Sequence, residues 1–137
     1  MKDLFDLMGR LMLAAIFLFL AIDKSTDKTD TLKLMADYGF SWKPEFLYHA
    51  SIFALTLGAI LVGIGYRVGI GTILICIYWL PYTFAVYNFW QSDSAHSYFE
   101  QTMFMKNIAI VGGLLVLTAN GAGKYSIKRL LATTIVK

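Results

Sequence analysis

Charged residues are scarce in this 137-residue chain, and so are cysteine, proline and histidine. Only 15% of the residues are Asp, Glu, Lys or Arg, whereas an ordinary soluble domain carries about 25%. A single cysteine excludes an internal disulfide and every cysteine-rich metal motif. Two histidines, His49 and His96, leave little room for haem or zinc ligation. We therefore expect no cofactor that is bound covalently or through metal ligation.

Hydrophobic residues are abundant instead. They make up 58% of the chain, aromatic residues make up 15%, and the mean hydropathy is +0.61. These values exclude a disordered tail and an ordinary soluble globule. The composition is typical of a small integral membrane protein, and the length allows one domain at most.

Four apolar stretches are long enough to cross a bilayer as helices, which takes roughly 20 residues for a hydrocarbon core of about 30 Å. They cover residues 4–22, 46–65, 68–90 and 103–120. None of them alternates apolar and polar residues, as the strands of a membrane barrel do. The sequence therefore predicts an all-α fold, an integral membrane bundle of four transmembrane helices forming a single domain over residues 1–137.

The connections between these spans predict how the helices follow one another. Residues 65–67 are almost the whole link between the second and third spans, so these two helices should form a tight antiparallel hairpin. Residues 91–102 are expected to form a short polar loop. The longest connection follows the first span and predicts a short extra helix from Thr31 to Tyr38, with Asp30 as its N-cap and Gly39 as its stop.

The distribution of charge predicts the orientation in the membrane. The side with both termini and the 65–67 turn carries seven Lys and Arg residues against two acids, and the opposite side carries five against seven. Because Lys and Arg favour the cytoplasmic side, we expect both termini in the cytoplasm. The positive net charge is thus a signal of topology and does not indicate a nucleic-acid partner.

Arg10 lies almost two turns inside the first span. It either extends its guanidinium to the headgroups, with its stem in the apolar layer, or it is a buried cation that anchors a carboxylate or an anionic headgroup. No acid in the other spans can pair with it, which favours the first interpretation.

Pro81 lies in the middle of the third span and removes one backbone hydrogen bond. The kink expected there is either a packing feature or the opening of a lateral pocket for a lipophilic ligand. Four glycines, Gly58, Gly63, Gly112 and Gly113, are expected to let helices approach closely.

Polar and aromatic residues gather where the four spans reach the outer interface. Residues at this level include Asp23, Lys24, His49, Tyr87, Asn88, Phe89, Trp90, Lys106 and Asn107. A ligand carbonyl could accept a hydrogen bond from Lys106, Asn107 or His49, and aromatic rings could sandwich the ligand. We take His49, Trp90, Lys106 and Asn107 as candidate ligand-binding residues, with a quinone headgroup as a suitable ligand. The alternative is that they are interfacial anchors. No catalytic residue and no metal ligand is assigned.

Several segments, in this order along the chain, resemble the DoxX family. They are MGRLMLAAIFLFLAIDK (residues 8–24), GAILVGIGYR (residues 58–67), the pair Phe89-Trp90, and FMKNIAIVGGLLVLTANGAGKYSIKR (residues 104–129). The resemblance implies a multi-pass protein of the bacterial inner (plasma) membrane. Members of that family have been linked to quinone-coupled oxidoreductases and other membrane redox complexes.

Two functions from different classes stay open at this point. The resemblance implies a subunit or anchor of a quinone-linked membrane oxidoreductase complex, with the lipid bilayer and other redox-complex subunits as its partners and with the electron-carrying cofactors on those subunits. The alternative is a non-enzymatic membrane scaffold or a protein that binds lipophilic ligands. The aromatic third span and the glycine-rich helix faces fit this alternative.

Overall fold

The chain forms five helices in a computed structural model that describes residues 1–91, 94–127 and 129. They are α1 (Lys2–Thr26), α2 (Lys28–Asp37), α3 (Pro44–Gly63), α4 (Val68–Val86) and α5 (Ser94–Asn120). The described ranges contain no strand. All helices except α2 are long and apolar enough to cross a membrane. The predicted all-α bundle of four transmembrane helices with one short extra helix is therefore confirmed.

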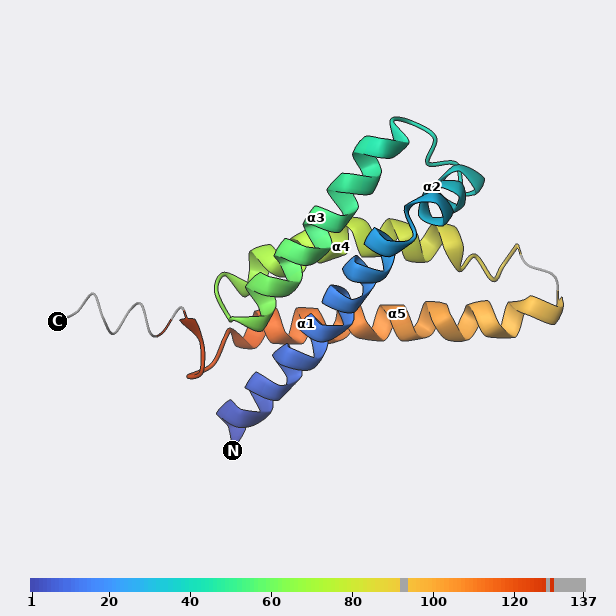
Figure 1. Cartoon of the computed structure of the whole chain (residues 1–137). Helices are drawn as coiled ribbons and strands as arrows, with labels where there is room; N and C mark the ends of the chain where they lie inside the picture. The colour runs from blue at the N-terminus through green and yellow to red at the C-terminus, as the bar shows by residue number, and fades with distance from the viewer. Residues whose placement is uncertain (92–93, 128, 130–137) are drawn as a thin grey trace.

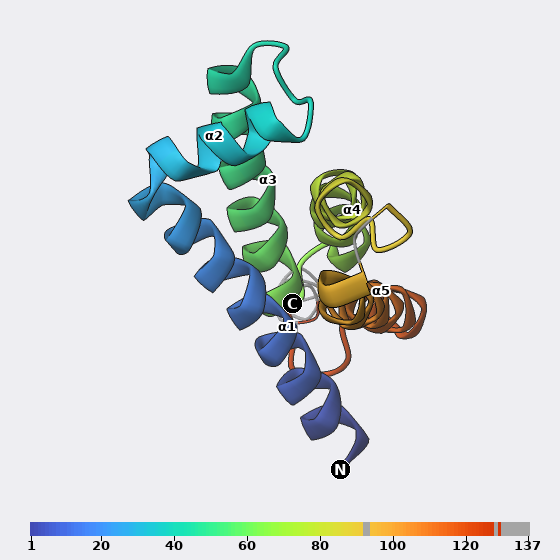
Figure 2. The same cartoon turned by 90° about the vertical axis from the view of Figure 1, so that its right-hand side faces the viewer.

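The helices form an open bundle (Figures 1 and 2). α1 packs mainly against α3, and α3 packs also against α4. α5 lies along α4, whereas α1 crosses α5 steeply and makes little contact with it. α2 runs from the end of α1 across to α3 at one end of the bundle (Figure 2). From this crossing α1 and α5 diverge towards the α2 end (Figure 1).

The core lies where the four long helices meet. Phe17, Leu55, Ile75 and Leu114, one from each of these helices, are fully buried. Many other large apolar side chains are exposed on the outside of the bundle. Such a surface is expected when the surrounding solvent is lipid, because the bilayer core is as apolar as the side chains themselves.

The hairpin of α3 and α4 is as tight as predicted. Its turn uses Gly65, whose φ is +70°, in the left-handed region that glycine adopts without strain. A Cβ atom added to Gly58 would lie 2.9 Å from the carbonyl oxygen of Gly71, so the two backbones are in close contact. A Cβ added to Gly112 would meet nothing within 4 Å. The expected close approach is therefore right at Gly58 and wrong at Gly112.

Helix boundaries differ from the predicted spans at both ends of the connection between α4 and α5. α5 begins at Ser94, nine residues before the predicted start of the fourth span. The prediction of a polar loop is therefore wrong for residues 94–102. Neither glycine nor proline interrupts the chain from residue 94 to 111, and a helix can form from polar residues as well as from apolar ones. α4 ends at Val86 rather than at residue 90. The chain then turns at Asn88, whose carbonyl oxygen accepts a hydrogen bond from Gln91 N at 2.8 Å.

The extra helix α2 begins at Lys28 and not at Thr31. Asp27 is its N-cap in place of the predicted Asp30. The backbone N–H of Asp27 donates to Asp23 O at 3.3 Å, and its carbonyl oxygen accepts from Thr31 N at 3.0 Å. One residue thus ends α1 and starts α2, which makes the corner between them sharp.

Arg10 is fully buried, so the interpretation that it extends to the headgroups is wrong. Its Nε lies 3.2 Å from Asp6 Oδ2, one turn earlier on the same helix. Its Nη2 donates to the carbonyl oxygen of Tyr125, in the segment that follows α5. That segment is held further by a hydrogen bond from Ile127 N to Ile64 O at 3.1 Å. The prediction was wrong because it considered only acids in the other spans, whereas the partner, Asp6, lies on α1 itself.

Three residues that enter the charge count, Asp93, Lys128 and Lys137, lie outside the described part of the chain.

Candidate functional site

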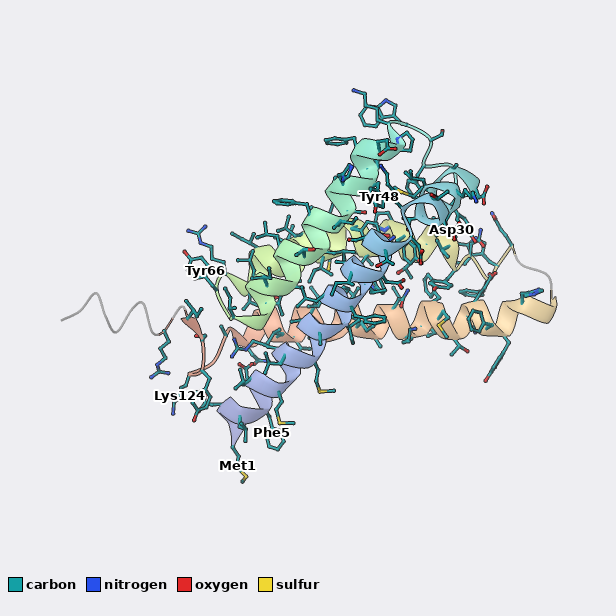
Figure 3. All side chains as sticks on the ribbon, in the orientation of Figure 1. Met1, Phe5, Asp30, Tyr48, Tyr66 and Lys124 are labelled. Carbon is teal, nitrogen blue, oxygen red and sulfur yellow. The ribbon has the colours of Figure 1, made fainter. Side chains whose placement is uncertain are left out.

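A cleft of about 710 Å³ opens between α1, α2, α4 and α5. It lies at the α2 end of the bundle. Figure 3 shows Asp30, on the rim of the cleft, at one end of the molecule and Met1 and Lys124 at the other. Its walls combine an apolar part, an aromatic part and several charged side chains. Its lining includes Ile16, Phe19, Asp23, Lys24, Asp27, Asp30, Trp79, Tyr82, Tyr87, Lys106, Asn107 and Ile110.

The last turn of α1 places Lys24 at the cleft. Its ammonium nitrogen lies 5.0 Å from the ring centre of Tyr78 and 5.2 Å from that of Tyr82. These two rings stack with their centres 5.6 Å apart. The backbone carbonyl of Lys24 accepts a hydrogen bond from Tyr48 Oη at 3.0 Å, which ties the end of α1 to α3. The cation is thus held in place by aromatic faces through cation–π attraction.

Trp79 lines the same cleft as Lys24. Its side chain is only 5% exposed, it stacks on Tyr82 with ring centres 5.7 Å apart, and it meets the edge of Phe17. Its indole N–H has no acceptor among the described residues. A buried donor without a partner costs about 1–3 kcal/mol. A ligand that brings an acceptor to this N–H would recover that cost.

Asn107 links α5 to α4 next to the cleft. Its Nδ2 donates to Thr83 Oγ1 at 3.1 Å, and Thr83 Oγ1 donates to the carbonyl oxygen of Trp79 at 2.7 Å. The Asn107 amide therefore faces the bundle. Lys106 is exposed beside it, with its Nζ 3.1 Å from Met103 Sδ.

The structure brings together two of the four candidate ligand-binding residues. Lys106 and Asn107 both line the cleft, but His49 and Trp90 do not. His49 lies on α3 outside the cleft, with its side chain 70% exposed and its Nε2 3.9 Å from Glu45 Oε2. Trp90 lies beyond the end of α4 and packs on aromatic rings, including that of Phe104 at 5.9 Å. The four candidate residues, expected at a similar depth in the membrane, therefore do not form one shared site.

Sequence reasoning missed Trp79 and Tyr82, and it noted Lys24 without selecting it. The spacing of Trp79 and Tyr82 could have indicated a shared wall, since residues three apart lie on one face of a helix. The acids of α2 had no such signal. Asp27 and Asp30 reach the rim only because α2 folds back over the end of the bundle.

A second, smaller cavity of about 290 Å³ lies between α2, α3 and α4. Pro81 lines it together with apolar side chains and with Tyr78 and Tyr82. Its position agrees with the lateral pocket that was one of the two interpretations of Pro81. Tyr82 lines both cavities.

Within the described residues, no group of three or more His, Cys, Asp and Glu side chains is placed to hold a metal ion. The expectation that the chain carries no cofactor of its own stays a prediction.

The fold and the cleft define a helical, multi-pass membrane protein with a ligand-sized cleft near one end of its bundle. The chain belongs to the SURF4 family, whose family model matches residues 1–130. It is similar to the ER-derived vesicles protein ERV29 of Saccharomyces cerevisiae, with 31% identity over 85 residues. These residues are 60% of this chain and 27% of the yeast protein, so the chain spans about a quarter of the length of that curated relative. No solved structure matches the chain.

This family membership overturns three predictions. The DoxX assignment is wrong, and so is the quinone-linked oxidoreductase complex that it implied. The bacterial inner membrane is also wrong, because the relative is a yeast protein of ER-derived vesicles. The multi-pass membrane character is supported, while the charge-based orientation of the termini stays a prediction.

The motifs that suggested DoxX have structural roles, which explains why they misled. Arg10 holds the segment after α5, Gly58 lets α3 and α4 touch, Gly65 forms the turn, and Asn107 bonds α5 to α4. Such residues meet the packing needs of a small helical bundle and carry no information about a reaction.

Proposed function

We propose that this chain is a non-enzymatic membrane protein of vesicle membranes, and that it binds a lipophilic ligand in the cleft between α1, α2, α4 and α5. The observation that carries the proposal is the buried, unpaired N–H of Trp79, a residue that lines this cleft together with Lys24. A donor and a cation are placed there before any ligand arrives, which lowers the cost of binding.

The comparisons support this class of function over redox chemistry. The name of the yeast relative places that protein in vesicles derived from the ER. We extend the same kind of membrane to this chain as part of the proposal.

A second candidate is a scaffold that holds a segment of a partner protein in the same cleft. The exposed carboxylates of Asp23, Asp27 and Asp30 at the mouth favour it, because they would attract a positively charged segment. Both candidates use one site, so one experiment separates them.

Photo-crosslinking from the cleft tests the proposal. Phe19 lines the cleft and is 68% exposed, whereas Phe53 on α3 is 65% exposed and lines none of the described cavities. Benzoylphenylalanine is placed at one position or the other, the purified membranes are irradiated, and the adducts are identified by mass spectrometry. We expect one dominant lipophilic adduct at position 19, lost in Trp79→Phe, and a mixture of bulk lipids at position 53.

A dominant protein adduct at position 19 would instead select the scaffold candidate. The same mixture of lipids at both positions would refute a binding role for the cleft.

A further inference from the structure

The cleft changes its chemistry in a fixed order along the bundle. Ile16 and Ile110 form an apolar wall deep in the membrane-spanning part of α1 and α5. Lys24 lies eight residues further along α1, which is about 12 Å of helix. Asp27 and Asp30 lie beyond it at the mouth. The order along α1 from the membrane core outward is therefore apolar surface, cation and carboxylates.

We propose that the ligand of this cleft is a zwitterionic glycerophospholipid, an inference that rests on the proposed function. Its phosphate would be bound by Lys24 and by the indole N–H of Trp79. Its headgroup amine would face the carboxylates at the mouth, and an acyl chain would cover the apolar wall. Such a lipid carries acyl chain, phosphate and amine in the same order as the three zones of the cleft.

The phosphate subsite is inferred from two donors, the indole N–H of Trp79 and the ammonium of Lys24. Trp79 N–H has no acceptor among the described residues, and Lys24 Nζ lies over the rings of Tyr78 and Tyr82. A phosphate offers several oxygen acceptors, so it can serve both donors at once, and its charge strengthens each hydrogen bond. A neutral carbonyl would satisfy the indole but would add no negative charge to that which the Lys24 ammonium already meets at Asp23.

The amine subsite is formed where α1 passes into α2. Asp23, Asp27 and Asp30 bring three exposed carboxylates to the mouth. Asp30 forms an ion pair with Lys33 at 3.5 Å, and both of these side chains are largely exposed. A headgroup ammonium is attracted here, whereas a headgroup with a second negative charge is repelled.

Residues of the cleft wall that are exposed on the membrane-spanning part of α1 favour a lipid over a peptide as the ligand. α1 and α5 diverge at this end (Figure 2), and the cleft wall includes Phe19 and Ile16, which are 68% and 41% exposed on the outside of α1. These residues belong to the part of α1 that can span a membrane. A lipid can therefore enter sideways from the bilayer and keep its acyl chain in apolar surroundings throughout.

Lipid binding to the purified, delipidated full chain tests the inference. Native mass spectrometry measures the dissociation constants of phosphatidylethanolamine, phosphatidylcholine, phosphatidylglycerol and diacylglycerol. We expect one molecule of either zwitterionic lipid to bind about tenfold more tightly than the other two. Lys24→Met and Trp79→Phe should each weaken zwitterionic binding by about tenfold to a hundredfold, because each removes one hydrogen bond to a charged group. Lys43→Met and Trp42→Phe, outside the cleft, are the matched controls and should change nothing.

The carboxylates have their own test. Asp27→Asn should weaken binding of phosphatidylethanolamine severalfold and should not weaken binding of phosphatidylglycerol. Asp37→Asn, at the far end of α2 and away from the cleft, is the control. Circular dichroism checks that each variant is folded, and Lys24→Met decides the phosphate subsite if Trp79→Phe does not fold.

The two proposals fail in distinguishable ways. If phosphatidylglycerol or diacylglycerol binds as tightly as phosphatidylethanolamine while Trp79→Phe and Lys24→Met still lower affinity, the zwitterionic headgroup is refuted and a lipophilic ligand in the cleft is retained. If both variants bind every lipid as the unmodified chain does, the cleft binds no lipid and both proposals are overturned.

Discussion

Replacing Arg10 with methionine should destabilise the bundle strongly. Methionine keeps most of the unbranched apolar stem of arginine but removes the guanidinium. The substitution leaves Asp6, whose side chain is 16% exposed, without its cation. It also removes the donor to the carbonyl oxygen of Tyr125, which holds the segment after α5 against α1.

The structure sets the size of the effect. Removing one partner of a buried ion pair costs about 3–5 kcal/mol, because the remaining charge stays buried without compensation. Asp6 keeps some contact with the surroundings, so we expect the lower end, about 3 kcal/mol of unfolding free energy. Arg67→Met removes an exposed arginine of the neighbouring turn and should cost less than about 0.5 kcal/mol.

A double variant distinguishes the loss of attraction between Asp6 and Arg10 from the cost of leaving the Asp6 carboxylate buried without a cation. Asp6→Leu combined with Arg10→Met removes both charges, so it should recover most of the loss and come within about 1 kcal/mol of the unmodified chain. The unfolding free energy is measured by titrating sodium dodecyl sulfate into mixed micelles and following the helical circular dichroism. Equal losses for Arg10→Met and Arg67→Met would refute the reasoning, and so would a double variant that is no more stable than Arg10→Met.

Other predictions follow from contacts elsewhere in the bundle. Gly58→Ala should destabilise the protein by about 1–3 kcal/mol because its Cβ would collide with backbone, whereas Gly112→Ala, in open space, should be neutral or stabilising by up to about 1 kcal/mol; the same titration compares them. Asn107→Leu should cost about 1–2 kcal/mol because it breaks the interhelical hydrogen bond to α4, and a loss no larger than that of an exposed site would contradict this role. Cysteines placed at Lys28 and Lys124 on a cysteine-free background should react with an impermeant maleimide from opposite sides of sealed vesicles, and labelling from one side would exclude the four-span topology. The purified chain should show no stoichiometric absorbance between 400 and 450 nm, and a Soret band would overturn the expectation that it carries no haem.

The number and the order of the membrane helices could be predicted from the sequence because each span carries its own signal. Transfer of about 20 apolar residues into lipid is favourable wherever those residues occur in the chain. The ends of the helices could not be predicted in this way. Residues 94–102 include several polar side chains, so hydropathy did not predict a helix there, yet they form the first turns of α5.

The candidate site could be predicted only in part. Lys106 and Asn107 were found because a cation and an amide in an apolar stretch stand out. Trp79 and Lys24 were not selected, because an aromatic residue inside a span and a lysine at its end are normal in every membrane helix. Only the unpaired indole N–H and the cation over two rings set them apart.

The sequence by itself determined that this protein is a membrane bundle with a tight hairpin in its middle, since hydropathy and one glycine turn act over a few neighbouring residues. The tertiary structure decided which polar side chains share a site. His49 and Lys106 were expected at similar depth, but the rotation of α3 turns His49 outward while α5 presents Lys106 to the cleft. The packing of Arg10 against Asp6 and the segment after α5 was decided in the same way. The rotation of a helix about its axis depends on its packing against all of its neighbours. A short stretch of sequence therefore cannot determine that rotation.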